Sequence, residues 1–284
     1  MKYHSHDNKP PTLFVISILM LVFIGGVFLY KSIVKNNLNR GGNTVGKQLQ
    51  EKQTSVNIPS PTPLELSIDV KKWLLATSAV LSYRNGERLN TLDCGLPGHD
   101  EAMILKDWWG ITGSTTAAET LEWLKYEGHS RSFSDLYESI TQLAQNEDQY
   151  QIVKTKMLKE DTGSVEGQKR LAFALDFIWK NKEKFKGKKL YAWDYMRMAN
   201  VARWSYSAGY ITEETAWQYM YHGGVKLQKT YTSWEELGEH YILGRTFWNG
   251  STNHSDISYG IRWLSTNPSS PWKTNDWNMD LTRR

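Results

Sequence analysis

The sequence is poor in the residue patterns that signal chemistry. It has one cysteine, Cys94, among 284 residues, which excludes an intrachain disulfide and is compatible with a reducing compartment. No histidine or acidic residue has metal-ligand spacing, and Gly223 and Gly224 follow no predicted strand and precede no Lys-Ser/Thr pair, so they form no phosphate loop. No segment alternates apolar and polar residues between hairpin turns, so no sheet is expected. The sequence therefore predicts no metal ion and no cofactor, and it identifies no catalytic residue.

The positive charge is concentrated at the N-terminal end. Residues 1–63 hold seven Lys/Arg against two Asp/Glu, whereas residues 64–284 hold 27 basic and 28 acidic residues, a net charge of −1. The sequence pI of about 8.9 therefore reflects the N-terminal segment. Because nucleic-acid binding needs a basic face on the folded part, no nucleic-acid partner is expected.

Residues 13–30 are an uncharged, largely apolar run of 18 residues. As a helix this run is about 27 Å long, close to the roughly 30 Å of a hydrocarbon core. A cleavable signal peptide would have a shorter apolar region and a small-residue cleavage site, whereas this run ends in bulky residues. The sequence predicts an uncleaved, single-pass transmembrane helix, with the lipid bilayer as its partner.

The run divides the chain into a short N-terminal tail (1–12), a transmembrane helix (13–30), a flexible polar linker (31–61) and a helical domain (62–284). Four basic residues follow the run within residues 31–47 and two precede it. The positive-inside rule then places the domain in the cytoplasm, on the inner (cytoplasmic) membrane. The few apolar residues of the linker favour disorder.

Helical spacing of apolar residues predicts an all-α domain. Thr62 and Pro63 are expected to start the first helix, and Gly86 to end it. Further helices are expected at about 116–127, 133–146, 149–160, 165–186, 190–208, 212–229 and 234–248, with a short one near 256–264. Trp263, Trp272 and Trp277 are expected to pin the C-terminal tail onto the domain.

The most informative helix is expected at residues 190–208. It is apolar or aromatic almost all round, which is typical of a buried helix, and Gly209 and Thr212 are expected to end it and to cap the next one. Charged groups in such a helix must be paired or functional. Asp194 can pair with Arg197, and Asn200 with Arg203, since each pair has i,i+3 spacing.

Several strings of the sequence carry a family resemblance: Ala-Trp193-Asp194-x-x-Arg197-x-x-Asn200-x-x-Arg203-Trp204, Gly209-Tyr-Ile-Thr-Glu-Glu-x-Ala-Trp217, Ser233-Trp234-Glu-Glu-Leu-Gly238, Tyr241-x-Leu-Gly244-Arg245-x-Phe-Trp248, Trp109-Gly-Ile111 and Gly128-His129. Together they resemble the bacterial domain-of-unknown-function family 1266 (DUF1266) over about residues 105–250. The family has no established activity, so the resemblance implies a common fold unit and a bacterial origin and transfers no catalytic residue.

Two interpretations of the polar residues remain open. In the first, an Asp/Arg/Trp-lined pocket binds an anionic ligand, and its candidate residues are Asp194, Arg197, Asn200, Arg203, Arg245, Trp193 and Trp204. In the second, Asp194 and Arg197 form a structural ion pair. A nucleophilic Cys94 would need a base such as His99 or His129 within reach, and the alternative is an ordinary small buried residue.

The lysine-rich stretch 180–189 also has two readings. It is either a solvated helix end or a contact for anionic lipid. The function expected from these features is that of a membrane-tethered helical interaction or regulatory module with an unknown protein partner. The alternative is an enzyme or a binder of a small anionic ligand.

Overall fold

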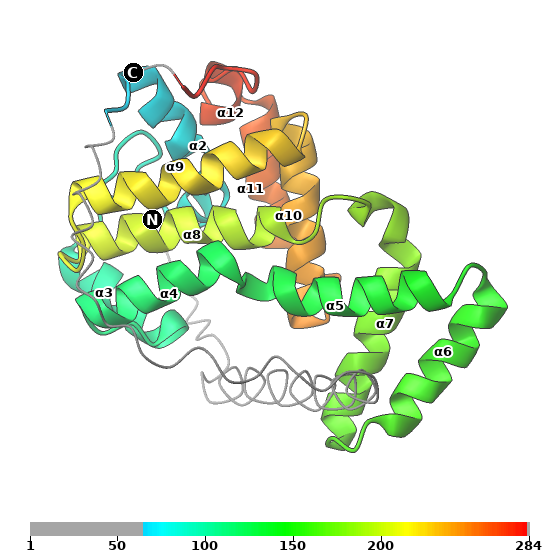
Figure 1. Cartoon of the computed structure of the whole chain (residues 1–284). Helices are drawn as coiled ribbons and strands as arrows, with labels where there is room; N and C mark the ends of the chain where they lie inside the picture. Colours follow the sequence, from blue (N-terminus) through cyan, green and yellow to red (C-terminus); the bar gives the residue numbers. More distant parts are fainter. Residues whose placement is uncertain (1–64, 283–284) are drawn as a thin grey trace, which may run out of the picture.

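The computed structural model describes residues 65–282, and every regular element in this part of the chain is a helix (Figure 1). The helices are α2 (Ile68–Asn85), α3 (Gly98–Trp109), α4 (Ser114–Tyr126), α5 (Gly128–Leu143), α6 (Glu147–Glu160), α7 (Val165–Phe185), α8 (Tyr191–Ser207), α9 (Glu213–Thr230), α10 (Trp234–Asn249), α11 (Ser255–Thr266) and α12 (Pro271–Thr274). The expected all-α domain is confirmed for these residues.

Helix α8 is the centre of the domain. Every residue from 192 to 205 is buried, because α2, α3, α4, α5, α9 and α10 all pack against this helix. Helices α8 and α9 run side by side as an αα-hairpin (Figure 1). The sequence-based prediction of a buried helix here is confirmed.

The predicted helix ends of this hairpin are also confirmed. Gly209 has φ +74° and its N–H donates to the Tyr206 carbonyl oxygen at 2.9 Å, which closes α8. The Thr212 hydroxyl accepts from the Thr215 N–H and caps α9. The Ser233 hydroxyl does the same for α10, accepting from the Glu236 N–H at 3.1 Å.

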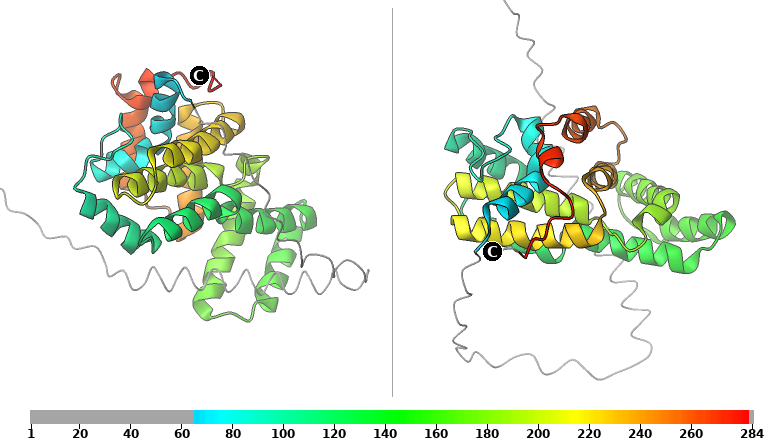
Figure 2. Two further views of the ribbon diagram at one scale, coloured as in Figure 1. Left: turned by 60° about the vertical axis from the view of Figure 1, so that its left-hand side comes forward. Right: turned by 90° about the horizontal axis from the view of Figure 1, so that it is seen from above.

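Helices α5, α6 and α7 form an arm that projects from the rest of the domain in both Figure 1 and Figure 2. Tyr150 of α6 stacks on Trp179 of α7 with ring centroids 4.7 Å apart. The Tyr150 hydroxyl donates to Asp176, which also pairs with Lys154. These contacts hold α6 on α7.

The C-terminal tail is pinned by tryptophans, as predicted. Trp263 stacks on Tyr83 of α2, Trp272 donates its indole N–H to the Ala76 carbonyl oxygen, and Trp277 donates to that of Tyr231. The indole N–H groups thus find backbone acceptors while the rings bury apolar area.

Helices α2, α3 and α5 differ from the prediction. Helix α2 begins at Ile68, capped by Ser67, and Glu65 is not helical. Helix α3 was not expected, because its start at Pro97-Gly98 has the composition of a loop. Helix α5 begins at Gly128, because a side chain distant in sequence caps it there. Gly128 was expected only to end the preceding helix.

The predicted membrane span at 13–30 and the predicted linker at 31–61 lie outside the described residues, as does the expected start at Thr62. Within residues 65–282, no helix is both long enough and apolar enough to cross a bilayer.

Candidate functional site

Asp194 caps the N-terminus of a helix that is distant in sequence. Its carboxylate accepts the backbone N–H groups of His129, at 3.0 Å, and Ser130, at 2.8 Å. These are free donors at the start of α5, where no side chain of the local sequence provides a cap. An anion at this position is favoured by the helix dipole.

Gly128 makes this approach possible. It has φ +53°, a conformation that side chains rarely adopt, and a Cβ there would lie 2.4 Å from an Asp194 carboxylate oxygen. The family strings Gly128-His129 and Trp193-Asp194 therefore contact each other where α5 meets α8.

Arg197 completes a buried polar group with Asp194 and His129, which we call the Asp194 cluster. Its guanidinium donates to Asp194 at 3.0 Å, to His129 Nδ1 at 2.8 Å and to the Trp193 carbonyl oxygen at 2.9 Å. It also lies over the rings of Trp193 and Trp109, at 4.0 and 5.1 Å from their centroids. The predicted ion pair is confirmed as a buried contact.

The protonation states in the Asp194 cluster follow from its geometry. Burial and the charge of Arg197 lower the pKa of His129, so its Nδ1 is a neutral acceptor for Arg197; the distance from this nitrogen to Asp194 is longer, 3.5 Å. Burial by itself would raise the pKa of Asp194, but the charge of Arg197 and the contact with Ser130 outweigh it and lower this pKa. The cluster therefore holds one anion and one cation.

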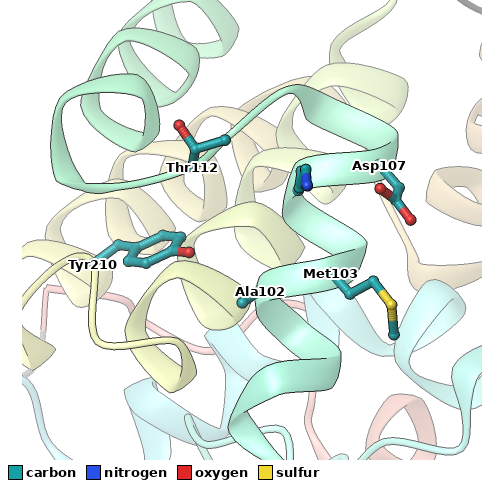
Figure 3. Close-up of a pocket in the computed structure, with 6 residues that line it drawn as sticks. Ala102, Met103, Asp107, Thr112 and Tyr210 are labelled. Carbon is teal, nitrogen blue, oxygen red and sulfur yellow. The ribbon is translucent and has the colours of Figure 1, made fainter.

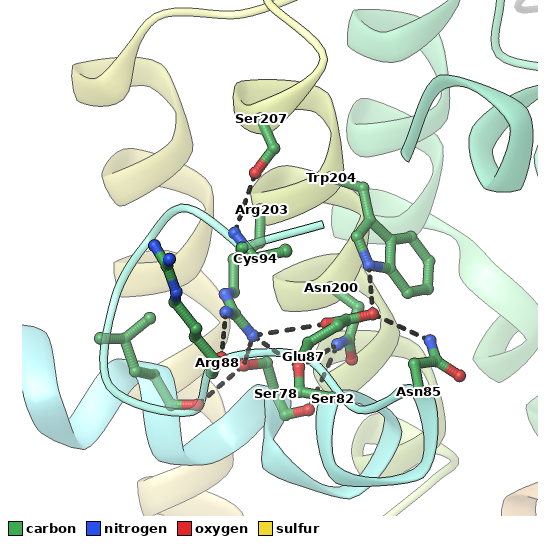
Figure 4. Close-up of polar contacts among 12 residues, drawn as sticks. Ser78, Ser82, Asn85, Glu87, Arg88, Cys94, Asn200, Arg203, Trp204 and Ser207 are labelled. Carbon is green, nitrogen blue, oxygen red and sulfur yellow. Dashed lines mark hydrogen bonds and ion pairs between the residues drawn. The ribbon is translucent and has the colours of Figure 1, made fainter. Parts of the chain in front are cut away.

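A second buried group lies two turns further along α8 (Figure 4). Arg203 donates to the hydroxyls of Ser78 and Ser82 on α2 and to the carbonyl oxygens of Arg88, Thr91 and Leu92. All five N–H donors of its guanidinium can be used in this way. Arg203 thus fixes the C-terminal half of α2 and the loop after it onto α8.

Asn200 and Trp204 belong to this second group, but they do not pair with Arg203. Asn200 donates to the Ser78 carbonyl oxygen and the Ser82 hydroxyl, and Trp204 donates to Glu87 at 2.8 Å. The expected pair between Asn200 and Arg203 is wrong, because both side chains extend to α2 instead of along α8.

Arg245 lies apart from both groups. It is 3.6 Å from Asp256 in the first turn of α11, a carboxylate that Arg84 also contacts at 2.8 Å. The residue before Arg245, Gly244, lets α10 approach α8, since a Cβ there would lie 2.3 Å from the Cβ of Trp193. Arg245 therefore joins α10 to α11.

Cys94 has no base among its contacts. Its backbone N–H donates to the Ser207 hydroxyl (Figure 4), and burial raises the pKa of its thiol to about 12. His99 pairs with Asp100, and His129 belongs to the Asp194 cluster. At neutral pH the sulfur is a protonated thiol, which is a poor nucleophile.

A surface hollow of about 530 Å³ lies on α3 (Figure 3), and none of the seven candidate residues lines it. Its lining residues come from α3, from the loop before α4 and from the turn before α9: Ala102, Met103, Lys106, Asp107, Thr112 and Tyr210. No sequence motif indicates this hollow, because α3 itself was not predicted. Across the described part of the chain, no three His, Cys, Asp or Glu side chains gather as metal ligands.

Residues 104–277 match the family described as "Protein of unknown function (DUF1266)". The chain belongs to this family. The match extends the resemblance beyond residue 250 to the pinned C-terminal tail. No curated protein and no solved structure matches the chain.

For this DUF1266 protein, the contacts of α8 divide the predicted ligand residues into separate groups. Asp194, Arg197 and Trp193 lie together, Asn200, Arg203 and Trp204 lie together, and Arg245 stands alone. Sequence reasoning gave no role to Ser78, Ser82 or Glu87. Gly128 was expected only to end a helix and His129 was considered only as a base for Cys94, and both also belong to the family strings.

Proposed function

We propose that this DUF1266 protein is a membrane-tethered module that binds a protein partner through exposed residues of α3 and α4. The observation that carries this proposal is a group of large apolar side chains left exposed on these two helices, which we call the α3–α4 face: Met103, Trp108, Trp123 and Tyr126. Met and aromatic residues are enriched at protein interfaces, and Trp and Tyr are among the residues that most often dominate the binding energy.

Contacts beneath the α3–α4 face link its two helices. Trp109 lies against Arg197, Arg197 bonds His129, and the His129 ring packs edge-on against Trp123 at 5.2 Å. Of the four exposed side chains, Trp123 thus packs on the buried Asp194 cluster, whereas Trp108 packs edge-on against the buried Trp204. Both rings therefore rest on a rigid base. A partner with an apolar surface would gain from meeting such a base, because little side-chain freedom is lost on binding.

The polar groups of α8 support an interaction module over a small-ligand site. Arg203 uses its donors within the fold, and Asp194 is occupied by α5 and Arg197. A ligand at either place would have to displace these contacts, at the full cost of leaving buried groups unpaired.

The membrane part of the proposal rests on the sequence. A single span at 13–30, followed by a linker at 31–61, would hold the domain near the cytoplasmic face of the inner membrane. Alkaline carbonate extraction with N-terminal sequencing tests it. Release by carbonate, or a mature protein that starts after residue 30, would rule out the tether.

The interface is tested by a photo-crosslinking amino acid placed in the full chain in native membranes. Tyr126 and Tyr259 are a matched pair, since both are tyrosines, 69% and 66% exposed, on different parts of the domain. We expect a discrete protein adduct from position 126 and none from position 259, with the adduct reduced by Trp123→Ala. Equal adducts from both positions, or none from position 126, would rule out the α3–α4 face as the interface.

A further inference from the structure

One short segment of the folded part carries an excess of positive charge. Residues 180–189 contain six lysines and one glutamate, a net charge of +5, whereas the rest of residues 64–284 has 21 basic and 27 acidic residues, a net charge of −6. This segment is therefore a local cationic site on an otherwise acidic domain.

The segment covers the end of α7 and the turn into α8. Lys180, Lys184, Lys186 and Lys189 are exposed, and we call them the lysine turn. Among the described residues none of these four forms an ion pair, whereas their neighbour Lys188 pairs with Glu236 of α10. Lys182 lies over the ring of Trp179.

The backbone of this turn is well defined. Gly187 and Lys189 both have positive φ, +76° and +48°, and Lys189 is the one such non-glycine residue within 65–282. The Lys188 N–H donates to the Phe185 carbonyl oxygen at 2.9 Å. Lys188 and Glu236 tie the turn to α10, so the free lysines project from a fixed support.

The chemistry of the lysine turn suits a diffuse anionic surface. Lysine ammonium groups are point charges without the fixed fork that selects one phosphate geometry. A nucleic acid would extend beyond this short segment and meet the acidic remainder of the domain. A lipid surface, in contrast, can contact this one edge of the domain without meeting the acidic remainder.

We propose that the lysine turn contacts anionic phospholipid headgroups of the bilayer that holds the chain. The inference rests on the proposed membrane tether. Each lysine near an anionic leaflet strengthens binding roughly fivefold, so four lysines contribute on the order of several hundredfold, which is weak for a free protein. A tether makes such weak contacts effective by raising the local concentration, and a linker of this length has an r.m.s. reach of about 30 Å.

The test uses the full chain reconstituted into vesicles of phosphatidylcholine alone or of phosphatidylcholine mixed equally with phosphatidylglycerol. An amine-reactive reagent labels the lysines, and mass spectrometry gives the rate at each one. We expect labelling of the lysine turn to be slowed several-fold only with phosphatidylglycerol, and high salt to remove the protection. The exposed Lys106 of α3 and Lys156 of α6 are internal controls and should label equally in both vesicles.

A pair of variants tests whether the lysine turn itself makes the contact. Lys182, which lies among the four lysines, serves as the reporter. Its protection should disappear in the variant with Lys180→Gln, Lys184→Gln, Lys186→Gln and Lys189→Asn. It should persist when the same number of exposed lysines is changed elsewhere, at Lys72, Lys106, Lys156 and Lys159.

Flotation of the vesicles separates the two proposals. Protein that floats with both vesicles but labels identically in them keeps the tether and overturns the lipid contact. Protection of the lysine turn by added nucleic acid without vesicles also overturns it. Protein that floats with neither vesicle overturns both proposals.

Discussion

Replacing Asp194 with alanine should destabilise the domain far more than an ordinary surface change. The substitution removes the partner of Arg197, which is buried, and the acceptor of two N–H groups at the start of α5. Breaking a buried pair by removing one partner costs about 3–5 kcal/mol. For a domain of this size each kcal/mol lowers the melting temperature by roughly 2–4 °C, so we expect a loss of roughly 10 °C.

The assay is a thermal melt of the full chain in detergent, followed by near-ultraviolet circular dichroism. Asp69 gives a matched control, because it pairs with Lys72 at the same i,i+3 spacing but on the surface. Asp69→Ala should cost less than about 1 kcal/mol. Its melt should therefore lie within a few degrees of the wild type.

The double variant Asp194→Leu/Arg197→Met separates the ion pair from the helix cap. It leaves no buried charge unpaired, so stability should recover in part. Recovery should stop short of the wild type, because the N–H groups of His129 and Ser130 still lack their acceptor. The remaining loss measures the cap together with the contacts that Arg197 makes to His129 and Trp193.

A near-normal melt of Asp194→Ala would refute this reasoning. The ligand-site interpretation predicts a different pattern for Arg197→Ala, in which stability is almost unchanged and binding of an anionic ligand is lost. Melts of the two single variants and the double variant therefore decide between a structural pair and a ligand site.

Three further predictions follow from other parts of the fold. Gly128→Ala should lower the free energy of unfolding by about 3 kcal/mol or more, since the added Cβ meets Asp194. Gly110 has a similar φ but lies in open space, so Gly110→Ala should lower it by about 1 kcal/mol. Equal melting temperatures of the two variants would contradict the close contact. Burial, with the charge of Lys188, lowers the pKa of His240 to about 4. As the pH falls below about 6.5, the His240 imidazole therefore binds a proton in the unfolded chain before it does so in the folded one. Up to about 3 kcal/mol of stability is lost in this way by pH 4. His240→Phe should flatten that dependence, and an unchanged slope would contradict the assignment. Residues 64–284 expressed alone should give a helix-dominated circular dichroism spectrum and bind DNA weakly at physiological salt; a strand-dominated spectrum or tight binding would contradict the sequence analysis.

The sequence by itself determined the helical class and the central hairpin. Gly209 and Thr212 act on N–H and carbonyl groups within a few residues, so their roles can be read locally. The near-complete apolar character of residues 190–208 likewise required burial on all sides. The i,i+3 spacing of Asp194 and Arg197 was enough to indicate their pairing.

Only the tertiary structure decided what the other polar groups of α8 contact. Asp194 caps α5 across 64 residues of chain, and Arg203 reaches serines of α2 more than 120 residues away. Spacing along one helix cannot indicate such partners, and it wrongly suggested that Asn200 and Arg203 pair. Helix α3 was missed for a related reason, since its start at Pro97-Gly98 reads as a loop until it packs against α8. Local hydrogen bonds are fixed by neighbours in sequence, whereas buried charges take whichever partners the packing of distant helices brings within reach.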